Sequence, residues 1–497
     1  MGMLGRLKVM SESMPKVKNF ELTVDPRPKF DLSPYMFMQF MEPLGSADGS
    51  VEAGWDFLTD SWREGLVNVT KELAPPLIRW PGGILTSYYR WKEGVGPRDK
   101  RVPMHNLCWG GMETNQVGTH EFIDFCRQVG SDPLIAINFE SDGKRNWSHP
   151  PKGGIRSAPP EETAEWIDYC NNPSNAERIK NGAEEPFNVR LWQIGNETSY
   201  GQHGFDCEIA AQRTLAFAQA MRKADPDIEL IGWGDSGWAG RMLEVAGDEL
   251  QYLAFHHHFR SNLEGESPLN EPDYRKDPEL TWKHLMSAYT SAEIRFKEMR
   301  DEIAGSDVKL AVTESHFGLP GRHRCEVLSS WAAGVANARV LNVQARNGDL
   351  IKIATLADFA GTVWMNNAII VQRSSAYMMP VARVMTLYRH HVGEKAIDLA
   401  KVPGDLDVTA SRTGNKIFLH VVNSNRTEAV FTDLQVKGMN IVSGRVFEIA
   451  EDPVVEINQF SPPELFAPVE YVLPDKGIWQ FPAASVSAVE LDIEEDG

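Results

Sequence analysis

The feature that most constrains the fold is a long alternation, from about residue 35 to residue 392, of short apolar runs with longer amphipathic stretches. This pattern is typical of βα units that build a parallel sheet. The stretches 121–129, 210–224 and 286–303 carry apolar residues at helical spacing. Strands are predicted at 36–41, 77–80, 134–138, 191–194, 229–233, 253–256, 309–313 and near Val363. Eight such units indicate an α/β fold, a (β/α)8 TIM barrel.

The competing architecture is an open, doubly wound sheet. No glycine fingerprint opens a helix after the first predicted strand, so a nucleotide-binding sheet of that kind is disfavoured. A chain of 497 residues is also long enough for a large barrel with a smaller module beside it.

The pattern of apolar and polar residues changes beyond about residue 394. Short alternating segments are punctuated there by Gly, Pro and Asn, which predicts an all-β C-terminal sandwich domain. The alternating segment 19–24 is predicted to add a strand to that sheet. We therefore expect N-terminal strands in 1–33 that join the sandwich, a catalytic barrel over 34–393 and the β-sandwich over 394–497.

Charge and composition exclude several classes of protein. The net charge of 50 − 69 = −19 argues against a nucleic-acid partner, because such binding uses Lys and Arg to neutralise phosphates. Five scattered cysteines do not suggest a disulfide framework or a Cys-x-x-Cys zinc site. Residues 1–20 lack the apolar core of a signal peptide, and no run approaches a membrane span. A cytoplasmic protein with no membrane partner is expected.

Two predicted strands end in glutamate. The run 191–194 continues into Gly195-Asn196-Glu197, and the run 309–313 continues into Glu314. Active sites of α/β barrels lie at the carboxyl ends of the strands. Two acids on separate strands that face one cleft are what glycoside hydrolysis requires. Taken singly, each acid could instead cap a following helix.

Several further motifs carry a resemblance to a known family. In order and spacing, the chain resembles the family 51 glycoside hydrolases, which are chiefly α-L-arabinofuranosidases. The motifs are Arg79-Trp80-Pro81-Gly82-Gly83, the run 89–99 with its Gly96-Pro97-Arg98-Asp99, Glu113-Thr114-Asn115, Gly118-Thr119, Gly195-Asn196-Glu197 and, around Glu42, the run 40–45. The similarity extends with gaps from about Phe20 into the predicted sandwich.

The resemblance implies a retaining, exo-acting hydrolase that removes terminal arabinofuranosyl residues from oligosaccharides. Glu197 would be the general acid/base and Glu314 the nucleophile. Arg79 would lie beneath the nucleophile and keep it ionised, whereas Asn196 and Glu42 would bind sugar hydroxyls. The resemblance implies no cofactor and no catalytic metal, and it suggests a homo-oligomer.

Departures from the family pattern affect the sugar pocket. Ile84 stands where the family usually has an asparagine, and Trp364 where it has a glutamine. His258 replaces a tyrosine, and Ser315-His316 replaces Trp-Asn after the nucleophile. Loss of an amide would leave a sugar hydroxyl unpaired, at about 1–3 kcal/mol. The alternatives are therefore a related barrel glycosidase with another sugar (β-xylosidase, galactofuranosidase or endo-glucanase) or a non-catalytic sugar-binding relative.

Three other features have two interpretations each. His256 and His258 project to one face of a strand and with His316 would suit zinc, but we predict that His256 and His258 bind substrate and that no metal is held. Trp109 is predicted to stack on the sugar, with a core position as the alternative. The segment 140–147 is predicted to be a barrel-top loop that selects the aglycone, or a solvated turn.

Overall fold

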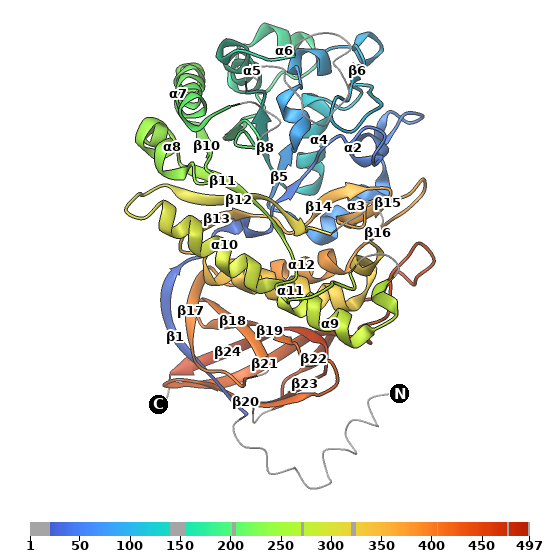
Figure 1. Ribbon diagram of the computed structural model, residues 1–497, viewed down its shortest axis with the longest axis vertical. Coiled ribbons are helices and arrows are strands. Elements are labelled where there is room, and N and C mark those ends of the chain that lie inside the picture. The colour runs from blue at the N-terminus through green and yellow to red at the C-terminus, as the bar shows by residue number, and fades with distance from the viewer. Residues whose placement is uncertain are drawn as a thin grey trace. The chain divides into compact units, whose positions relative to one another are not determined.

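The structure, a computed structural model, describes residues 20–139, 156–200, 205–269, 273–319, 325–404, 406–474 and 477–495 (Figure 1). The chain divides into two compact units. The barrel unit contains Asp31–His390 and Glu451–Ala467, and the β unit contains the described residues up to Phe30, His391–Ala450 and those from Pro468 onward. The domain limits given above stay predictions.

The barrel unit contains an eight-stranded parallel sheet, which confirms the predicted barrel. The first and last strands of the sheet are joined by a hydrogen bond. The N–H of Met38, just before the first strand, donates to the backbone oxygen of Ala354 in the last strand at 2.9 Å. In spatial order the strands are β2 (Gln39–Phe40), β5 (Leu77–Trp80), β8 (Asp132–Ile137), β9 (Leu191–Ile194), β10 (Glu229–Trp233), β11 (Tyr252–Phe259), β12 (Lys309–Phe317) and β13 (Ile351–Ala354).

The prediction of the last strand near Val363 was wrong. The eighth strand is β13, a four-residue run in which Lys352 interrupts the apolar residues and weakens the sequence signal. Val363 lies between β14 (Asp358–Gly361) and β15 (Asn367–Val371), which form a small separate sheet with β16 (Ala376–Met378). Its side chain is 44% exposed, so it does not belong to the barrel core.

The interior of the barrel is filled by apolar side chains contributed around the sheet, as expected for this fold. The cluster consists of Met38, Leu77, Leu134, Leu191, Ile231, Trp233, Ala254, Ala311 and Ile353. Because inward-facing residues recur every second position, Arg79, Gln193 and His256 follow on the same face toward the carboxyl ends. The apolar layer thus supports a layer of polar side chains.

A β-bulge sets the direction of Glu314. Strands β11 and β12 pair in register as far as Phe255 and Val312, and then the register shifts so that His256 pairs with Glu314. Simple alternation from the inward-facing Ala311 would place Glu314 on the outer face. The extra residue, Thr313, brings Glu314 onto the same face as His256.

Helices pack around this sheet (Figure 1). They include α3 (Glu64–Leu73), α4 (Thr119–Val129), α5 (Pro160–Asn171), α7 (Cys207–Ala224), α8 (Ala239–Ala246), α11 (Trp331–Arg346) and α12 (Pro380–His390). The predicted helix 286–303 is in fact two helices, α9 (Pro278–Ser287) and α10 (Tyr289–Glu302). Asp277 caps α9 by accepting from the Leu280 N–H, with Pro278 in the first turn, a start signal that the apolar pattern did not include. Among the helices of the described residues, none is long and apolar enough to cross a bilayer.

The β unit is a single nine-stranded sheet that curls around its own core, in agreement with the predicted all-β domain. The order is β22 (Val469–Val472), β21 (Met439–Ala450), β24 (Ser485–Glu495), β19 (Lys416–Asn423), β18 (Leu406–Thr413), β17 (Lys395–Lys401), β1 (Glu21–Asp31), β20 (Val430–Val436) and β23 (Ile478–Phe481). An extra β20–β21 pairing links the two ends of this order. The N-terminal β1 lies parallel to β20, with Leu22 and Val24 in the apolar core.

Candidate active site

Glu314 is held by a buried cation. Arg79, at the carboxyl end of β5, has no exposed surface, and its Nη1 donates to Glu314 Oε1 at 3.0 Å. Removing a guanidinium from water in this way is costly unless a carboxylate pairs with it. The neighbouring Phe40 ring lies 5.9 Å from the guanidinium carbon. The contact with Arg79 therefore holds Glu314 in one orientation.

Arg79 also fixes Asn196. Its Nη2 donates to Asn196 Oδ1, so the amide group cannot turn over without losing this bond. Asn196 is 1% exposed, and within the described part of the chain its Nδ2 has no hydrogen-bond partner. A buried amide donor left in this state costs free energy unless a ligand accepts from it. Asn196 is thus oriented to donate to a ligand oxygen.

Glu197 projects from a sharp turn after β9. Its φ of +51° lies in the left-handed region, and so does the φ of +73° at Gly195. A Cβ at Gly195 would come within 2.8 Å of Thr198 Cγ2 and 3.0 Å of Phe139 Cβ, so only glycine allows this close approach. The turn directs the Glu197 carboxylate toward β11.

His256 lies between the two carboxylates. Its Nδ1 is 3.0 Å from Glu197 Oε1 and 3.6 Å from Glu314 Oε2, while its Nε2 is 3.1 Å from Thr313 Oγ1. A neutral ring with its proton on Nδ1 donates to Glu197 and accepts from the Thr313 hydroxyl. The bulge residue Thr313 thereby fixes the ring that links the two acids.

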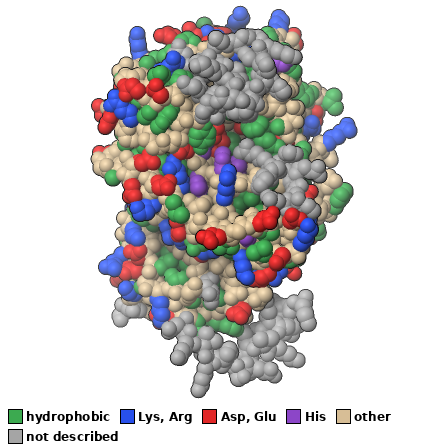
Figure 2. Space-filling model, viewed as in Figure 1, with side chains coloured by type: hydrophobic (Ala, Val, Ile, Leu, Met, Phe, Trp, Pro, Cys, Tyr) green, Lys and Arg blue, Asp and Glu red, His purple; other side chains and the backbone are tan. Residues whose placement is uncertain are grey.

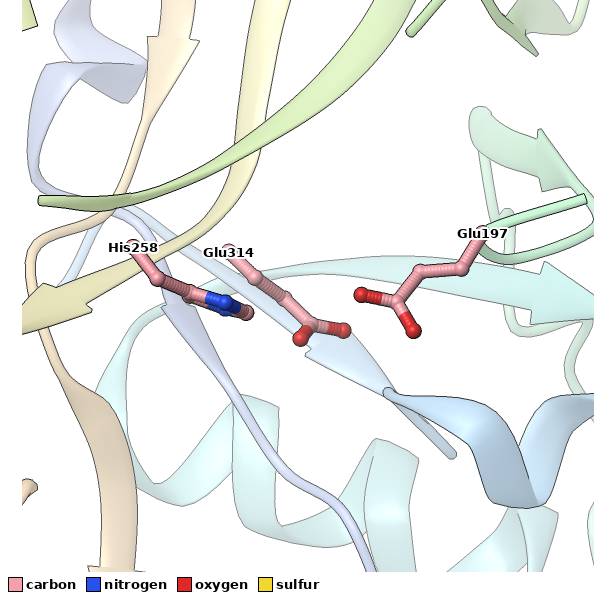
Figure 3. Close-up of side chains that lie close together, drawn as sticks. All are labelled: Glu197, His258 and Glu314. Atoms are coloured by element: carbon pink, nitrogen blue, oxygen red, sulfur yellow. The ribbon is translucent and has the colours of Figure 1, made fainter. Parts of the chain in front are cut away.

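His258, two residues along β11, completes the group (Figure 3). One ligand atom each of Glu197, His258 and Glu314 lies within 4.8 Å of the others. The His258 ring stacks on His316 with centroids 4.2 Å apart and planes 20° apart. Figure 2 shows histidine and acidic side chains gathered in a hollowed part of the barrel unit's surface.

Glu42 and Trp109 are also brought together. Glu42 Oε1 accepts from Trp109 Nε1 at 3.0 Å and from the Leu85 N–H at 3.1 Å. A Cβ at Gly83, whose φ is +28°, would come within 1.8 Å of the Glu42 carboxylate, so the Gly-Gly pair makes room for this acid. The Trp109 ring meets Trp364 edge to face at 5.3 Å.

Two positioning acids were missed in the sequence. Asp235 accepts from the His256 N–H at 3.2 Å and from the Tyr200 hydroxyl at 3.3 Å. It lies two residues after the end of β10, so its position near the strand end could have identified it. Asp48 accepts from the Trp364 N–H at 3.1 Å and from four other donors of the 362–367 loop. Asp48 lies well beyond the end of β2, where no such signal exists.

The segment 140–147, predicted to contact the aglycone, lies outside the described residues. The three-histidine zinc arrangement is disfavoured because both ring nitrogens of His256 already contact Glu197 and Thr313.

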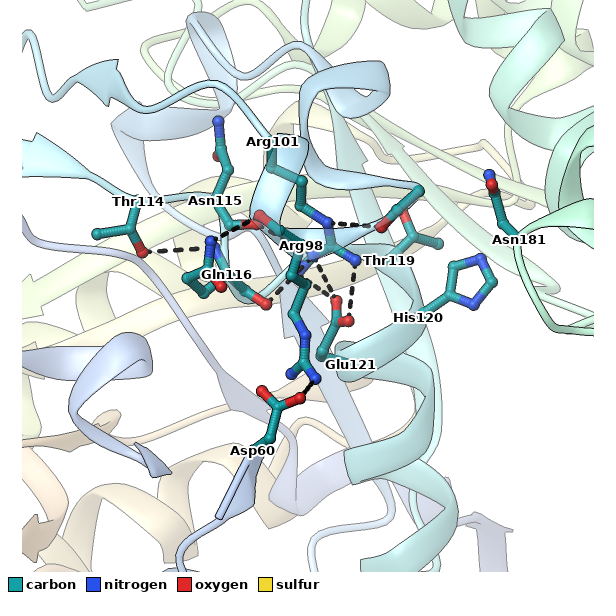
Figure 4. A network of polar contacts seen from close by, with 12 residues as sticks. Asp60, Arg98, Arg101, Thr114, Asn115, Gln116, Thr119, His120, Glu121 and Asn181 are labelled. Atoms are coloured by element: carbon teal, nitrogen blue, oxygen red, sulfur yellow. Dashed lines mark hydrogen bonds and ion pairs between the residues drawn. The ribbon is translucent and has the colours of Figure 1, made fainter. Parts of the chain in front are cut away.

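Other motif residues build a scaffold next to the site (Figure 4). Arg101 forms a two-bond ion pair with Glu121, at 2.9 Å for each bond, and donates to the backbone oxygens of Asn115 and Gln116. Asn115 itself adopts a φ of +56°. The Gly-Pro-Arg-Asp and Glu-Thr-Asn motifs therefore shape a loop.

The same loop orients Trp109. Asn106 Nδ2 donates to Glu113 Oε1 at 2.7 Å, and Asn106 Oδ1 accepts from the Trp109 N–H at 2.8 Å. Burial and the nearby Glu52 charge raise the pKa of Glu113 to about 7. Glu113 is thus an ionisable group, two hydrogen bonds away from Trp109, that titrates near neutral pH.

We expect Glu113→Gln to stabilise the protein more at pH 8 than at pH 5. The pKa of this carboxyl is raised from 4.5 to about 7 in the folded chain, so folding takes up a proton between these values. The free energy of unfolding of the wild type therefore falls by at most about 3 kcal/mol as the pH rises through this range. Glu113→Gln has no group that titrates at this position, so it does not show this decrease. Denaturant unfolding at both pH values measures the difference. The surface variant Glu184→Gln is the control, and a Glu113→Gln gain that does not depend on pH would contradict the assignment.

The fold has counterparts among known proteins. The thermostable GH51 alpha-L-arabinofuranosidase from Thermotoga petrophila matches with a TM-score of 0.77, over 95% of this chain and 100% of its own, at 24% sequence identity. At that identity the likeness shows the fold. Residues 69–275 match the family model described as the alpha-L-arabinofuranosidase 1 domain. Residues 69–275 are thus similar to an alpha-L-arabinofuranosidase domain, and the chain as a whole has the fold of the family 51 glycoside hydrolases.

Two curated proteins resemble this chain over part of its length. Alpha-L-arabinofuranosidase C of Emericella nidulans is 34% identical over 215 residues, which are 41% of this chain and 40% of that protein. The intracellular exo-alpha-(1->5)-L-arabinofuranosidase of Acetivibrio thermocellus is 32% identical over 264 residues, 49% of each chain. The matched part thus spans less than half the length of these relatives.

Proposed function

We propose that this chain is a family 51 glycoside hydrolase, a retaining, exo-acting α-L-arabinofuranosidase that removes terminal arabinofuranosyl residues from oligosaccharides. The observation that carries the proposal is the pair of carboxylates of Glu197 and Glu314, with oxygens no more than 4.8 Å apart. Retaining enzymes hold their carboxyl groups about 5–5.5 Å apart, whereas inverting enzymes need about 6.5–9.5 Å. The names of the relatives support the choice of sugar.

The two acids have different surroundings, which supports different roles. Glu314, paired with Arg79, attacks the anomeric carbon and forms a glycosyl ester as the bond to the leaving oxygen breaks. Glu197, which contacts His256, gives its proton to the leaving oxygen. It then takes a proton from the water that hydrolyses the ester, and Glu314 is released.

The remaining predicted site residues are assigned to substrate binding. Asn196 Nδ2 donates to the hydroxyl beside the reacting carbon, and the Glu42 carboxylate accepts from hydroxyls further round the ring. Trp109 forms a wall of the pocket. Arg79 and His256, whose side chains have no exposed surface, act on the substrate by holding the two acids in place. His258 lies beside the same acids and contacts the part of the sugar that reacts.

A panel of nitrophenyl glycosides tests the proposal, with the Glu314→Ala protein as the blank. The panel contains α-L-arabinofuranoside, β-D-galactofuranoside, β-D-xyloside and β-D-glucoside. We expect the arabinofuranoside to have the highest kcat/KM. Failure to hydrolyse any member would contradict the proposed activity.

The second candidate is a related glycosidase with a different sugar. Ile84, at 4% exposure, is a buried apolar residue between Gly83 and Leu85, which both approach Glu42, and it stands where the family usually has an amide. Such a loss of a hydrogen-bonding partner changes which sugar hydroxyls are accepted. Turnover of another panel member, with none of the arabinofuranoside, would favour this candidate.

We expect chelation to leave activity unchanged. Both proposed catalytic groups are carboxylates, and the proposed reaction moves protons between them and the substrate without metal. Dialysis against a chelator followed by assay of the preferred glycoside measures this. Loss of activity that zinc restores would overturn the metal-free mechanism.

Location and assembly are also proposed. A cytoplasmic location is supported by the word "intracellular" in the name of the Acetivibrio thermocellus relative, and cell fractionation tests it. A homo-oligomer is proposed from the family resemblance. Light scattering during size-exclusion chromatography tests it, and a monomer at micromolar concentration would contradict it. The net charge of −19 supports the proposal that nucleic acid is not a partner, and the sequence pattern supports the same for membranes.

A further inference from the structure

His258 gives the cleft a nitrogen ligand next to two carboxylates. The three residues come from separate parts of the barrel: the turn after β9, strand β11 and strand β12 (Figure 3). A tyrosine, expected at this position from the family pattern, offers no ligand nitrogen. With the two carboxylates, His258 forms a Glu-His-Glu donor set.

The spacing of the donor atoms suits a small divalent cation. Three atoms that all lie within 4.8 Å of one another have a point between them that is no more than about 2.8 Å from each. Zinc binds imidazole nitrogen and carboxylate oxygen at about 2.0–2.2 Å. Each donor atom therefore needs to move by less than about 1 Å to reach the bonding distance of zinc. Rotation of the side chains is enough for such a movement, without a change in the backbone.

The charge of the cleft is also suitable. Glu42, Glu197 and Glu314 supply three acidic side chains, and Arg79 donates to one oxygen of Glu314. A nitrogen with two carboxylate oxygens is a ligand set that zinc accepts.

Residues behind His258 would orient it as a ligand. Its ring stacks on His316, whose Nε2 lies 3.9 Å from Asp358 Oδ1 and whose Nδ1 lies 3.3 Å from Asn366 Nδ2. Groups that hold a metal-binding imidazole in place contribute about 10- to 100-fold to metal affinity. The stacked pair of imidazoles restricts the rotation of His258 out of the cleft.

The geometry points to a zinc site formed by Glu197, His258 and Glu314, at which a bound ion excludes the glycoside. This ion is an inhibitor and not a cofactor, because it engages both acids that the reaction needs. The metal site itself stands on the geometry alone. Its inhibitory effect rests on the proposed function.

Calorimetric titration of the full-length protein with zinc chloride tests the site without any substrate. We expect one ion per chain in the wild type. His258→Tyr, which restores the residue typical of the family, should weaken binding by about 100-fold or more, and His316→Ala by about 10- to 100-fold. His390→Gln, at an exposed histidine of α12, should leave the affinity unchanged.

Glu314→Gln is a second test that keeps the size of the side chain. It should also weaken zinc binding, because an amide is a poorer ligand than a carboxylate. Zinc binding that is equally tight in His258→Tyr and Glu314→Gln, or that disappears in His390→Gln, would overturn the site. A wild type that binds no zinc would also overturn it.

Kinetics separate this inference from the proposed function. With the preferred glycoside of the panel, zinc should raise KM and leave kcat unchanged. If no glycoside is hydrolysed but His258→Tyr still abolishes zinc binding, the proposed function fails and the metal site stands. If hydrolysis occurs and zinc binds without raising KM, the inference that zinc inhibits the enzyme is wrong.

Discussion

Glu314→Ala is expected to abolish turnover of every glycoside, with kcat lower by about 10⁴-fold or more. The ester intermediate cannot form without this carboxylate, and a water molecule in its place would lie at the wrong distance for direct attack. Steady-state hydrolysis of the preferred nitrophenyl glycoside measures the loss. No improvement of the leaving group should restore activity, because the nucleophile is needed in both steps.

A control is needed because Arg79 is fully buried and pairs with Glu314. Removing one partner of a buried pair typically destabilises a protein by about 3–5 kcal/mol. Glu314→Gln retains an oxygen that accepts from Arg79, so it should stay folded and equally inactive. Wild-type kcat in Glu314→Gln would contradict the assignment of the nucleophile.

Glu197→Ala is expected to have an effect that depends on the leaving group. Dinitrophenolate leaves without protonation, so glycosyl-enzyme formation from its glycoside should be nearly unaffected. Oligosaccharides and alkyl glycosides should lose about 10²- to 10⁴-fold in kcat/KM, the usual contribution of a general acid. A plot of log kcat/KM against leaving-group pKa should therefore be steeper for the variant than for the wild type.

Glu162→Gln is a comparison at another buried glutamate of the barrel unit, one that pairs with Arg90 away from β9 and β12. Any change in kcat/KM that Glu162→Gln causes should be the same for all substrates. An equal loss on activated and unactivated leaving groups in Glu197→Ala would remove Glu197 from the role of acid.

Much of the barrel could be predicted because its strands are buried on both faces and appear in the sequence as short apolar runs. The eighth strand was missed because Lys352 divides a run of four residues. The division of the predicted helix 286–303 at Ala288 was missed because Ser287 and Thr290 bond back to carbonyls of the chain, which the apolar spacing does not reveal.

The two acids could be found as strand-end glutamates, but the way they are positioned could not. The bulge at Thr313 that turns Glu314 inward depends on pairing with β11, a property of two strands together. Asp48 holds the Trp364 loop from a distant part of the chain, and its role depends on backbone N–H groups that have no sequence signature. His258 was predicted to bind substrate, and its stacking on His316 depends on a cross-strand register.

The stereochemistry of hydrolysis tests the central claim most directly, since it reports on how the carboxylates of Glu197 and Glu314 are used. Proton NMR spectra, recorded during the first minutes of hydrolysis of the preferred glycoside, identify the anomer that forms before mutarotation. The short separation of the two carboxylates predicts a first product with the same anomeric configuration as the substrate. A first product of inverted configuration would contradict the account.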